Sequence, residues 1–398
     1  MKLLKEKGIF NLTMKQLLRQ IVFVILLFSL TSIEAQNNKT DFKGFFEFTN
    51  TNWAPANSDR WTGISGVLNR VDFHWYVNKQ ITFYSGIRTN FNYGSLMADF
   101  YPVYKENLLL DNGYADLTFA LADKPSYLLY TNIDRINLKW NYKTLELTVG
   151  RQRINWGTNL IWNPNDIFNT YNYFNFDYIE RPGSDAVHLQ YYTGTLSSVQ
   201  IAAKLDHENK VTAAAMYKFN YKNYDIQLLG GVMDENMVLG GGWAGQIEGA
   251  GFTGEISYFN NLKNRYSDDQ WIASIAANYT FSNQLFLNSS IIYNSLGKTR
   301  NVGQQDFFRM NNLSPKTLTL SRINWFWELS YPLTPLIKAD LSAIVNPYDG
   351  SVFFGPSLDF NLTQNLELYT MAQVFTGRTG TEYGGIGQLY YLRLKWSF

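Results

Sequence analysis

The side chains that most often do chemistry in proteins are scarce in this sequence of 398 residues, which has three histidines and no cysteine. A serine hydrolase needs a histidine beside a serine and a polar group that orients its ring. His74 and His188 fall on separate expected strands, and no Gly-x-Ser-x-Gly elbow occurs. Without cysteine there are no disulfides and no thiolate metal ligands. The sequence therefore predicts no catalytic residues, no metal site, no cofactor and no enzyme activity.

Residues 150–185 gather charged, aromatic and turn-forming side chains in a local pattern. The segment contains Gly-Arg-Gln-Arg-Ile-Asn-Trp-Gly at 150–157, Trp-Asn-Pro-Asn-Asp at 162–166 and Arg-Pro-Gly-Ser-Asp at 181–185. Strict strand alternation would turn Arg151 and Arg153 toward lipid, which costs about 2–4 kcal/mol for each at the bilayer midplane. Either Gly150 forms a β-bulge that reverses the alternation, or the two arginines lie above the apolar band.

The remainder of this segment, residues 154–183, is rich in aromatic rings that would be poorly placed in water. We expect it to fold inward and constrict a pore. The alternative is an exposed aromatic surface that stacks on sugars or on a partner protein. The residues that we assign to the constriction are Arg151, Arg153, Trp156, Trp162, Asp166 and Arg181.

The elements around this segment alternate between apolar and polar residues, which is typical of β-strands. In the last segment, Leu392 and Leu394 share one face with Trp396, while Arg393 and Lys395 share the other. These segments exceed the five or six residues of an average strand and reach the roughly 9–11 residues that cross a membrane. Their apolar faces end in aromatic residues, as in the girdles of outer-membrane barrels. The sequence predicts a closed antiparallel transmembrane β-barrel.

The connections between these segments alternate in length. Short turns are expected near 78–79, 141–143, 193–195, 221–223, 247–249, 282–283, 332–335 and 363–364, and the other connections are 54–65, 92–128, 154–183, 206–209, 234–236, 261–269, 295–317, 346–350 and 377–384. This series corresponds to about 18 strands, with 16 as the alternative. Outer-membrane barrels place short turns in the periplasm and longer loops outside, which predicts the orientation.

Strand alternation also predicts which charged residues face the lumen. On the first four strands and the last, the inward basic residues are Lys43, Arg70, Arg88, Arg135, Lys139, Arg393 and Lys395. Only Glu47 and Asp72 oppose them there, while acids and bases mix on the rest of the wall. Because the last strand closes against the first, we expect one basic wall and a weak preference for anionic solutes. The alternative is that these charges only solvate the wall and pair with one another.

The first 36 residues have the order of a secretory signal peptide, with basic residues up to Arg19 and a largely apolar run to Leu30. That run is too short to span a bilayer, so we expect cleavage after Ala35 and a mature barrel over residues 37–398. Removing five bases and two acids changes the formal net charge from +1 to −2. This balance excludes a nucleic-acid binder, and 17% aromatic residues exclude intrinsic disorder.

The pattern Gly-Arg-Gln…Trp-Gly…Asn-Pro-x-Asp…Arg-Pro-Gly at 150–183 resembles one found in poorly characterised, porin-like families of Gram-negative outer-membrane barrels. The ending Tyr390-x-Leu392-x-Leu394-x-Trp396-x-Phe398 resembles the signal that the barrel-assembly machinery recognises. The resemblance implies that this machinery is a partner through Phe398, that outer-membrane lipid surrounds the barrel, and that the barrel has a pore or export role.

These observations predict an outer-membrane channel for passive diffusion of small polar solutes, with no nucleic-acid partner. The alternative function is a closed barrel that binds or assembles surface polysaccharide, or that mediates adhesion.

Overall fold

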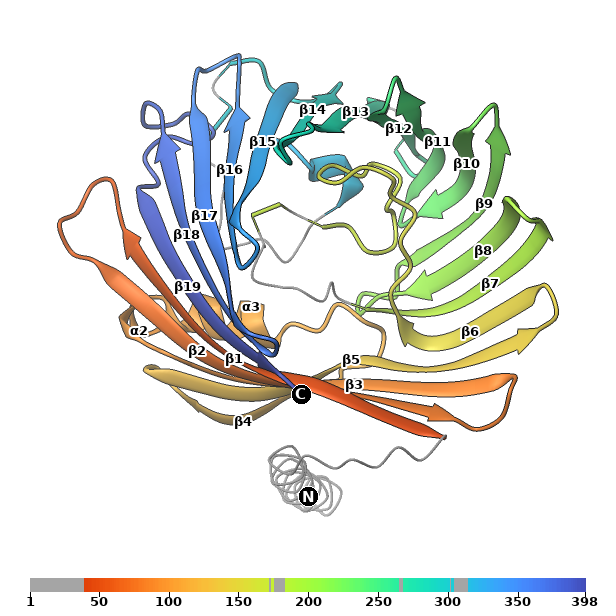
Figure 1. Ribbon diagram of the computed structural model, residues 1–398, viewed down its shortest axis with the longest axis horizontal. Helices are drawn as coiled ribbons and strands as arrows, with labels where there is room; N and C mark the ends of the chain where they lie inside the picture. The colour runs from red at the N-terminus through yellow and green to blue at the C-terminus, as the bar shows by residue number, and fades with distance from the viewer. Residues whose placement is uncertain (1–38, 172, 175–182, 265–267, 301, 304–313) are drawn as a thin grey trace.

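Eighteen antiparallel strands close into a barrel, because β1 pairs with β2 along one edge and with β19 along the other (Figure 1). The computed structural model describes residues 39–171, 173–174, 183–264, 268–300, 302–303 and 314–398. The wall strands are β1 (Thr40–Ala54), β2 (Thr62–Tyr76), β3 (Ile81–Tyr93), β5 (Tyr127–Tyr142), β6 (Leu145–Gln152), β7 (Ser184–Gly194), β8 (Ser197–Leu205), β9 (Val211–Tyr221), β10 (Tyr224–Met233), β11 (Asn236–Ile247), β12 (Ala250–Asn261), β13 (Gln270–Thr280), β14 (Phe286–Asn294), β15 (Ile323–Thr334), β16 (Ile337–Val345), β17 (Val352–Thr363), β18 (Leu366–Thr376) and β19 (Gln388–Ser397). The predicted fold and the count of 18 strands are confirmed. The expected signal peptide, 1–36, lies outside the described residues.

The two faces of the wall differ in polarity as the alternation predicts. On β13, Trp271 and Ile275 are exposed on the outer face, whereas Ser274 is buried on the inner face. On β19, Leu394 and Trp396 lie outside and Arg393 lies inside. Closure pairs the strand edges around the ring, which satisfies backbone groups that hydrocarbon cannot hydrogen-bond. The outer face is therefore suited to lipid.

Between β3 and β5 the chain inserts two short helices, α2 (Ser95–Asp99) and α3 (Tyr101–Leu109), and an extra strand, β4 (Thr118–Lys124). Strand β4 pairs with the first part of β5, from Tyr127 to Asn132, and β6 pairs with the second part, from Ile136 to Tyr142. Met97 of α2 packs in one apolar cluster with Leu128 and Tyr130 of β5. The sequence predicts a connection at 92–128 and locates neither these two helices nor β4.

None of the helices in the described ranges combines the length and the apolar composition that spanning a bilayer requires. The remaining helix is a single 3-10 turn, η1 (Pro315–Thr317), in the connection between β14 and β15.

The chain after β6 turns into the barrel, where its described part lies among the strands (Figure 1). Its side chains, including Trp156 and Phe168, form one apolar cluster with inward residues of the wall such as Phe326 and Phe353. The interior of this barrel therefore contains a hydrophobic core, and the inward fold predicted for residues 154–183 is confirmed for the residues that the structure describes.

Candidate functional site: the lumen and its inward segments

A carboxylate on β12 makes four hydrogen bonds with the inward segment. Oε1 of Glu255 accepts the backbone N–H and the hydroxyl of Thr158, the latter at 2.9 Å, and the N–H of Asn159 at 3.2 Å. Oε2 accepts the N–H of Asn165 at 2.9 Å. The Glu255 side chain is only 1% exposed. All four groups, from three residues, are hydrogen-bond donors, which suits the acceptor-only carboxylate, so Glu255 fixes the turn 158–165 against the wall.

Further contacts extend this attachment across the barrel. The Trp156 indole donates to Oε1 of Gln200 on β8 at 2.9 Å and meets Phe168 edge-on, with ring centroids 4.9 Å apart. Trp162 packs edge-on against Phe326 of β15, with centroids 6.2 Å apart. Phe174 packs edge-on against Phe353 of β17. We name residues 154–174 the lumen segment. Its described part contacts strands from β7, where Asn169 donates to the Ser184 hydroxyl, to β18, where Phe174 packs near Phe375.

The strands on the other side of the barrel also carry charged side chains, and their best buried ion pair involves a residue that sequence reasoning missed. The register between β3 and β5 shifts at Gly86/Ile87, where Asp134 is the extra residue of β5. Asp134 consequently lies inside together with Arg135. Arg70 reaches Asp134 at 2.7 Å and Asp72 at 2.8 Å. The neighbouring charged residues Asp134 and Arg135 could have revealed this bulge from the sequence, because strict alternation would turn one of them toward lipid.

The structure pairs most of the seven predicted basic residues with acids. Lys43 lies 2.8 Å from Asp41, Arg88 lies 3.5 Å from Asp134, Lys139 lies 2.6 Å from Glu146, Arg393 contacts Glu367 and lies 3.9 Å from Glu47, Arg135 donates to the carbonyl of Asp134 at 2.7 Å, and Lys395 lies over the ring of Phe45 at 4.8 Å. Their combined role in lining a pore remains a prediction. The pairing reduces the net field that they can exert on a passing ion.

The residues assigned to the constriction do not form one group. Trp156, Trp162 and Asp166 are buried in the lumen segment, while Arg153 is exposed at its start. Arg181 lies outside the described residues. Arg151 is a separate structural site that contacts the inserted segment, as described next.

Arg151 is buried where β5 changes partner from β6 to β4. Its guanidinium lies 2.7 Å from Asp111 and 2.7 Å from Asp185, and it also donates to the carbonyl oxygen of Ala115 at 2.5 Å. Strand β6 pairs with β5 and β7 without a register shift, although Gly150 has a φ of 115°. The β-bulge considered at Gly150 is therefore absent from both pairings of β6, and residues 111–115 cover the arginine.

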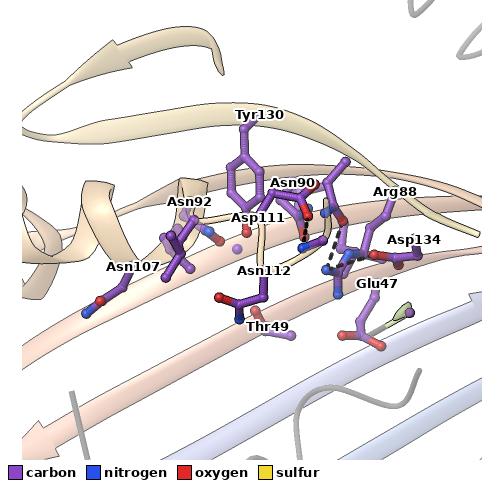
Figure 2. Close-up of a pocket in the computed structure, with 18 of the residues that line it drawn as sticks. Glu47, Thr49, Arg88, Asn90, Asn92, Asn107, Asp111, Asn112, Tyr130 and Asp134 are labelled. Carbon is purple, nitrogen blue, oxygen red and sulfur yellow. Dashed lines mark hydrogen bonds and ion pairs between the residues drawn. The ribbon is translucent and has the colours of Figure 1, made fainter. Parts of the chain in front are cut away.

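A polar hollow lies between the inserted segment and the inner faces of β1, β2, β3 and β5. Its volume is about 300 Å³. Five asparagines line it together with carboxylates and two arginines, and Figure 2 shows side chains from wall and insertion gathered around it. The polar lining residues are Glu47, Thr49, Arg88, Asn90, Asn92, Asn107, Asp111, Asn112, Asn132, Asp134 and Arg151, with the phenol of Tyr130. We name this hollow the asparagine pocket.

A buried carboxyl group secures the connection between β18 and β19. The Asn346 amide donates to Oε2 of Glu382 at 2.9 Å, and the Asn324 amide donates to both carboxylate oxygens at 3.1 and 3.2 Å. The Glu382 side chain has no exposed surface. Burial raises the pKa of Glu382 to about 7, and the nearby Asp349 carboxylate adds to the rise. We therefore expect the stability of this connection to depend on pH in the neutral range.

The closed 18-stranded wall with an inward segment is the architecture of an outer-membrane porin barrel. A family model described as "Protein of unknown function (DUF1302)" matches residues 135–294. No curated protein matches the chain. Among solved structures, Acinetobacter baumannii OccAB2 is similar with a TM-score of 0.56 and 10% identity, over 91% of this chain and 98% of that one. Pseudomonas aeruginosa OccK5 (OpdH) has a TM-score of 0.55 and 9% identity, over 90% and 98%. At these identities the likeness shows the fold alone.

Proposed function

We propose that this protein is an outer-membrane, porin-like channel through which small polar solutes diffuse passively. One observation carries the proposal: the lumen segment packs against β7–β18, while polar and charged side chains from β1 to β6 and β19 lie on the other side of the barrel. Solutes then pass between a fixed segment and a polar wall. A preorganised polar surface selects by size and hydrogen bonding.

A weak preference for anions belongs to this proposal. The basic residues on β1 to β6 and β19 contact the acids Asp134, Glu146, Glu47 and Glu367. Only a small net positive field therefore remains to attract anions. We expect a small reversal potential in a KCl gradient with the sign of chloride permeation. A potential of the opposite sign contradicts the preference and leaves the channel itself intact.

The amount of packing inside the barrel favours one competing function. The lumen segment and the insertion both bury aromatic or apolar residues against the wall, among them Trp156 and Met97. A barrel sealed by these segments would serve surface polysaccharide binding, assembly or adhesion instead of diffusion. Liposome swelling separates the two functions, because only a channel admits uncharged solutes.

The test uses the purified chain in liposomes, with arabinose, glucose and raffinose as solutes of increasing size. We expect swelling that slows as the solute grows. Deleting residues 162–176 removes much of the lumen segment and should increase the rate for raffinose most. Swelling no faster than in protein-free liposomes contradicts the channel and leaves the sealed barrel.

We also propose that Phe398 acts in assembly. Its backbone exchanges two hydrogen bonds with Gly44, at 2.9 and 3.1 Å, and its ring packs near Phe46 and Trp396. Phe398→Ala should reduce the amount of folded barrel in the outer membrane of cells, while refolding in detergent is retained. An unchanged folded fraction in cells contradicts this role.

A further inference from the structure

The asparagine pocket has a lining in which amide groups outnumber charged groups of either sign. Asparagines 90, 92, 107, 112 and 132 line it, with three carboxylates and two guanidinium groups. Each amide can both donate and accept hydrogen bonds. A solute hydroxyl has the same double capacity. The lining is therefore complementary to a molecule that carries several hydroxyl groups.

The charged residues of the pocket are already neutralised by one another or by neighbours. Asp111 lies 2.7 Å from Arg151, and Asp134 lies 2.7 Å from Arg70. Glu47 lies 3.9 Å from Arg393. A charged solute would have to break or compete with such pairs, and removing one partner of a buried pair is strongly destabilising. The pocket therefore disfavours ions of either sign as ligands.

Apolar groups and one buried amide complete the match. Leu108 and Leu110 line the pocket beside the ring of Tyr130, and such groups suit the C–H surface of a saturated ring. The Asn90 side chain is 6% exposed, and its amide nitrogen has no hydrogen-bond partner within the described residues. An unmet buried donor costs about 1–3 kcal/mol, which a hydroxyl oxygen of a ligand would offset.

We propose that the asparagine pocket binds a neutral, polyhydroxylated solute of about monosaccharide size. Its volume of about 300 Å³ is at the lower end of the range for small-molecule pockets. The pocket lies on the polar side of the barrel, against β1, β2, β3 and β5 (Figure 2). This inference rests on the proposed channel function and makes the pocket a binding step along the solute path.

The experiment measures glucose binding in two ways, by calorimetry on the detergent-solubilised barrel and by block of ion current in planar bilayers. Wild-type protein should bind glucose saturably and show a matching current block. Asn92→Ala and Asn112→Ala should each weaken binding by roughly two- to tenfold, the effect of losing one hydrogen bond. Asn220→Ala is the matched control, because Asn220 lies on β9 and donates to Asp225, away from the pocket. It should bind glucose like the wild type.

Gluconate and glucosamine, which carry opposite charges, test the neutrality of the ligand. Both should bind more weakly than glucose. Tighter binding of either ion overturns the proposal, as does the absence of saturable glucose binding, or equal losses in Asn92→Ala and Asn220→Ala. A barrel that binds glucose but conducts no ions would refute the channel function and support the sugar-binding pocket. A barrel that conducts ions but does not bind glucose would refute the sugar-binding pocket and support the channel function.

Discussion

Replacing Glu255 by glutamine should release the lumen segment while leaving the barrel folded. The carboxylate accepts four hydrogen bonds from residues 158–165. Glutamine keeps one acceptor oxygen and turns an NH₂ group toward the remaining donors. Losing a bond to a charged group costs about 1.5–3 kcal/mol, and leaving a buried donor unmet costs about 1–3 kcal/mol. The attachment should weaken by about 2.5–6 kcal/mol, which raises the population of the detached segment by roughly 70-fold or more.

Single-channel recording and limited proteolysis report this detachment. Glu255→Gln should show larger and noisier conductance, and proteinase K should cut within residues 154–171 faster than in the wild type. Glu146→Gln is the matched control, since it removes one inward carboxylate that pairs with Lys139 at 2.6 Å and lies on β6. Circular dichroism should show intact strands in both variants. Wild-type conductance, noise and cleavage in a folded Glu255→Gln barrel would refute the anchoring role.

Three further predictions concern stability. Arg151→Met leaves the largely buried carboxylates of Asp111 and Asp185 without their cation. This should cost about 3 kcal/mol and lower the unfolding temperature, whereas Arg153→Met, at an exposed residue, should not. Equal melting curves for the two variants would contradict the ion pair. Gly150→Ala should also lower the unfolding temperature, because φ is 115° and a Cβ would lie 2.3 Å from the carbonyl oxygen of Ile136. Gly350→Ala is the control, with φ of 70° and open space around it, and it should lower the unfolding temperature much less. A larger drop for Gly350→Ala than for Gly150→Ala would argue against crowding at Gly150. The native state binds a proton on Glu382 more tightly than the unfolded chain, so stability should fall as pH rises from 4.5 to about 7. The loss of stability over this pH range is about 3 kcal/mol. Glu382→Gln should abolish this part of the pH dependence of the unfolding temperature, and an unchanged pH profile in the variant would contradict the role of Glu382.

The strand architecture was predictable because one physical requirement repeats along the whole chain. Every wall strand needs an apolar outer face, as in Trp271 and Ile275, so alternation and turns locate the strands without knowledge of their neighbours. The inward fold of 154–183 followed from its rings, which need burial. Both inferences use local sequence only.

The charge pairs were harder to predict because they depend on contacts between distant segments. Asp134 enters the lumen through a bulge, and Arg151 is covered by residues 111–115 of an insertion that has no clear strand or helix signal. The apolar residues of the insertion helix α3 are spread around the helix, so its sequence lacks the apolar stripe that marks most helices. The asparagine pocket lies between that insertion and the wall. The alternation of residues along each strand could not predict it, because alternation does not show which distant segments come together.

The central claim is that solutes cross this barrel between the lumen segment and the polar wall. Single-channel recording of the purified full-length protein in a planar lipid bilayer tests it most directly, with heat-denatured protein as the control. The account predicts discrete, reproducible conductance steps that become larger when Glu255 is replaced by glutamine. A folded barrel that inserts into the bilayer and shows no steps, with or without that substitution, would contradict it.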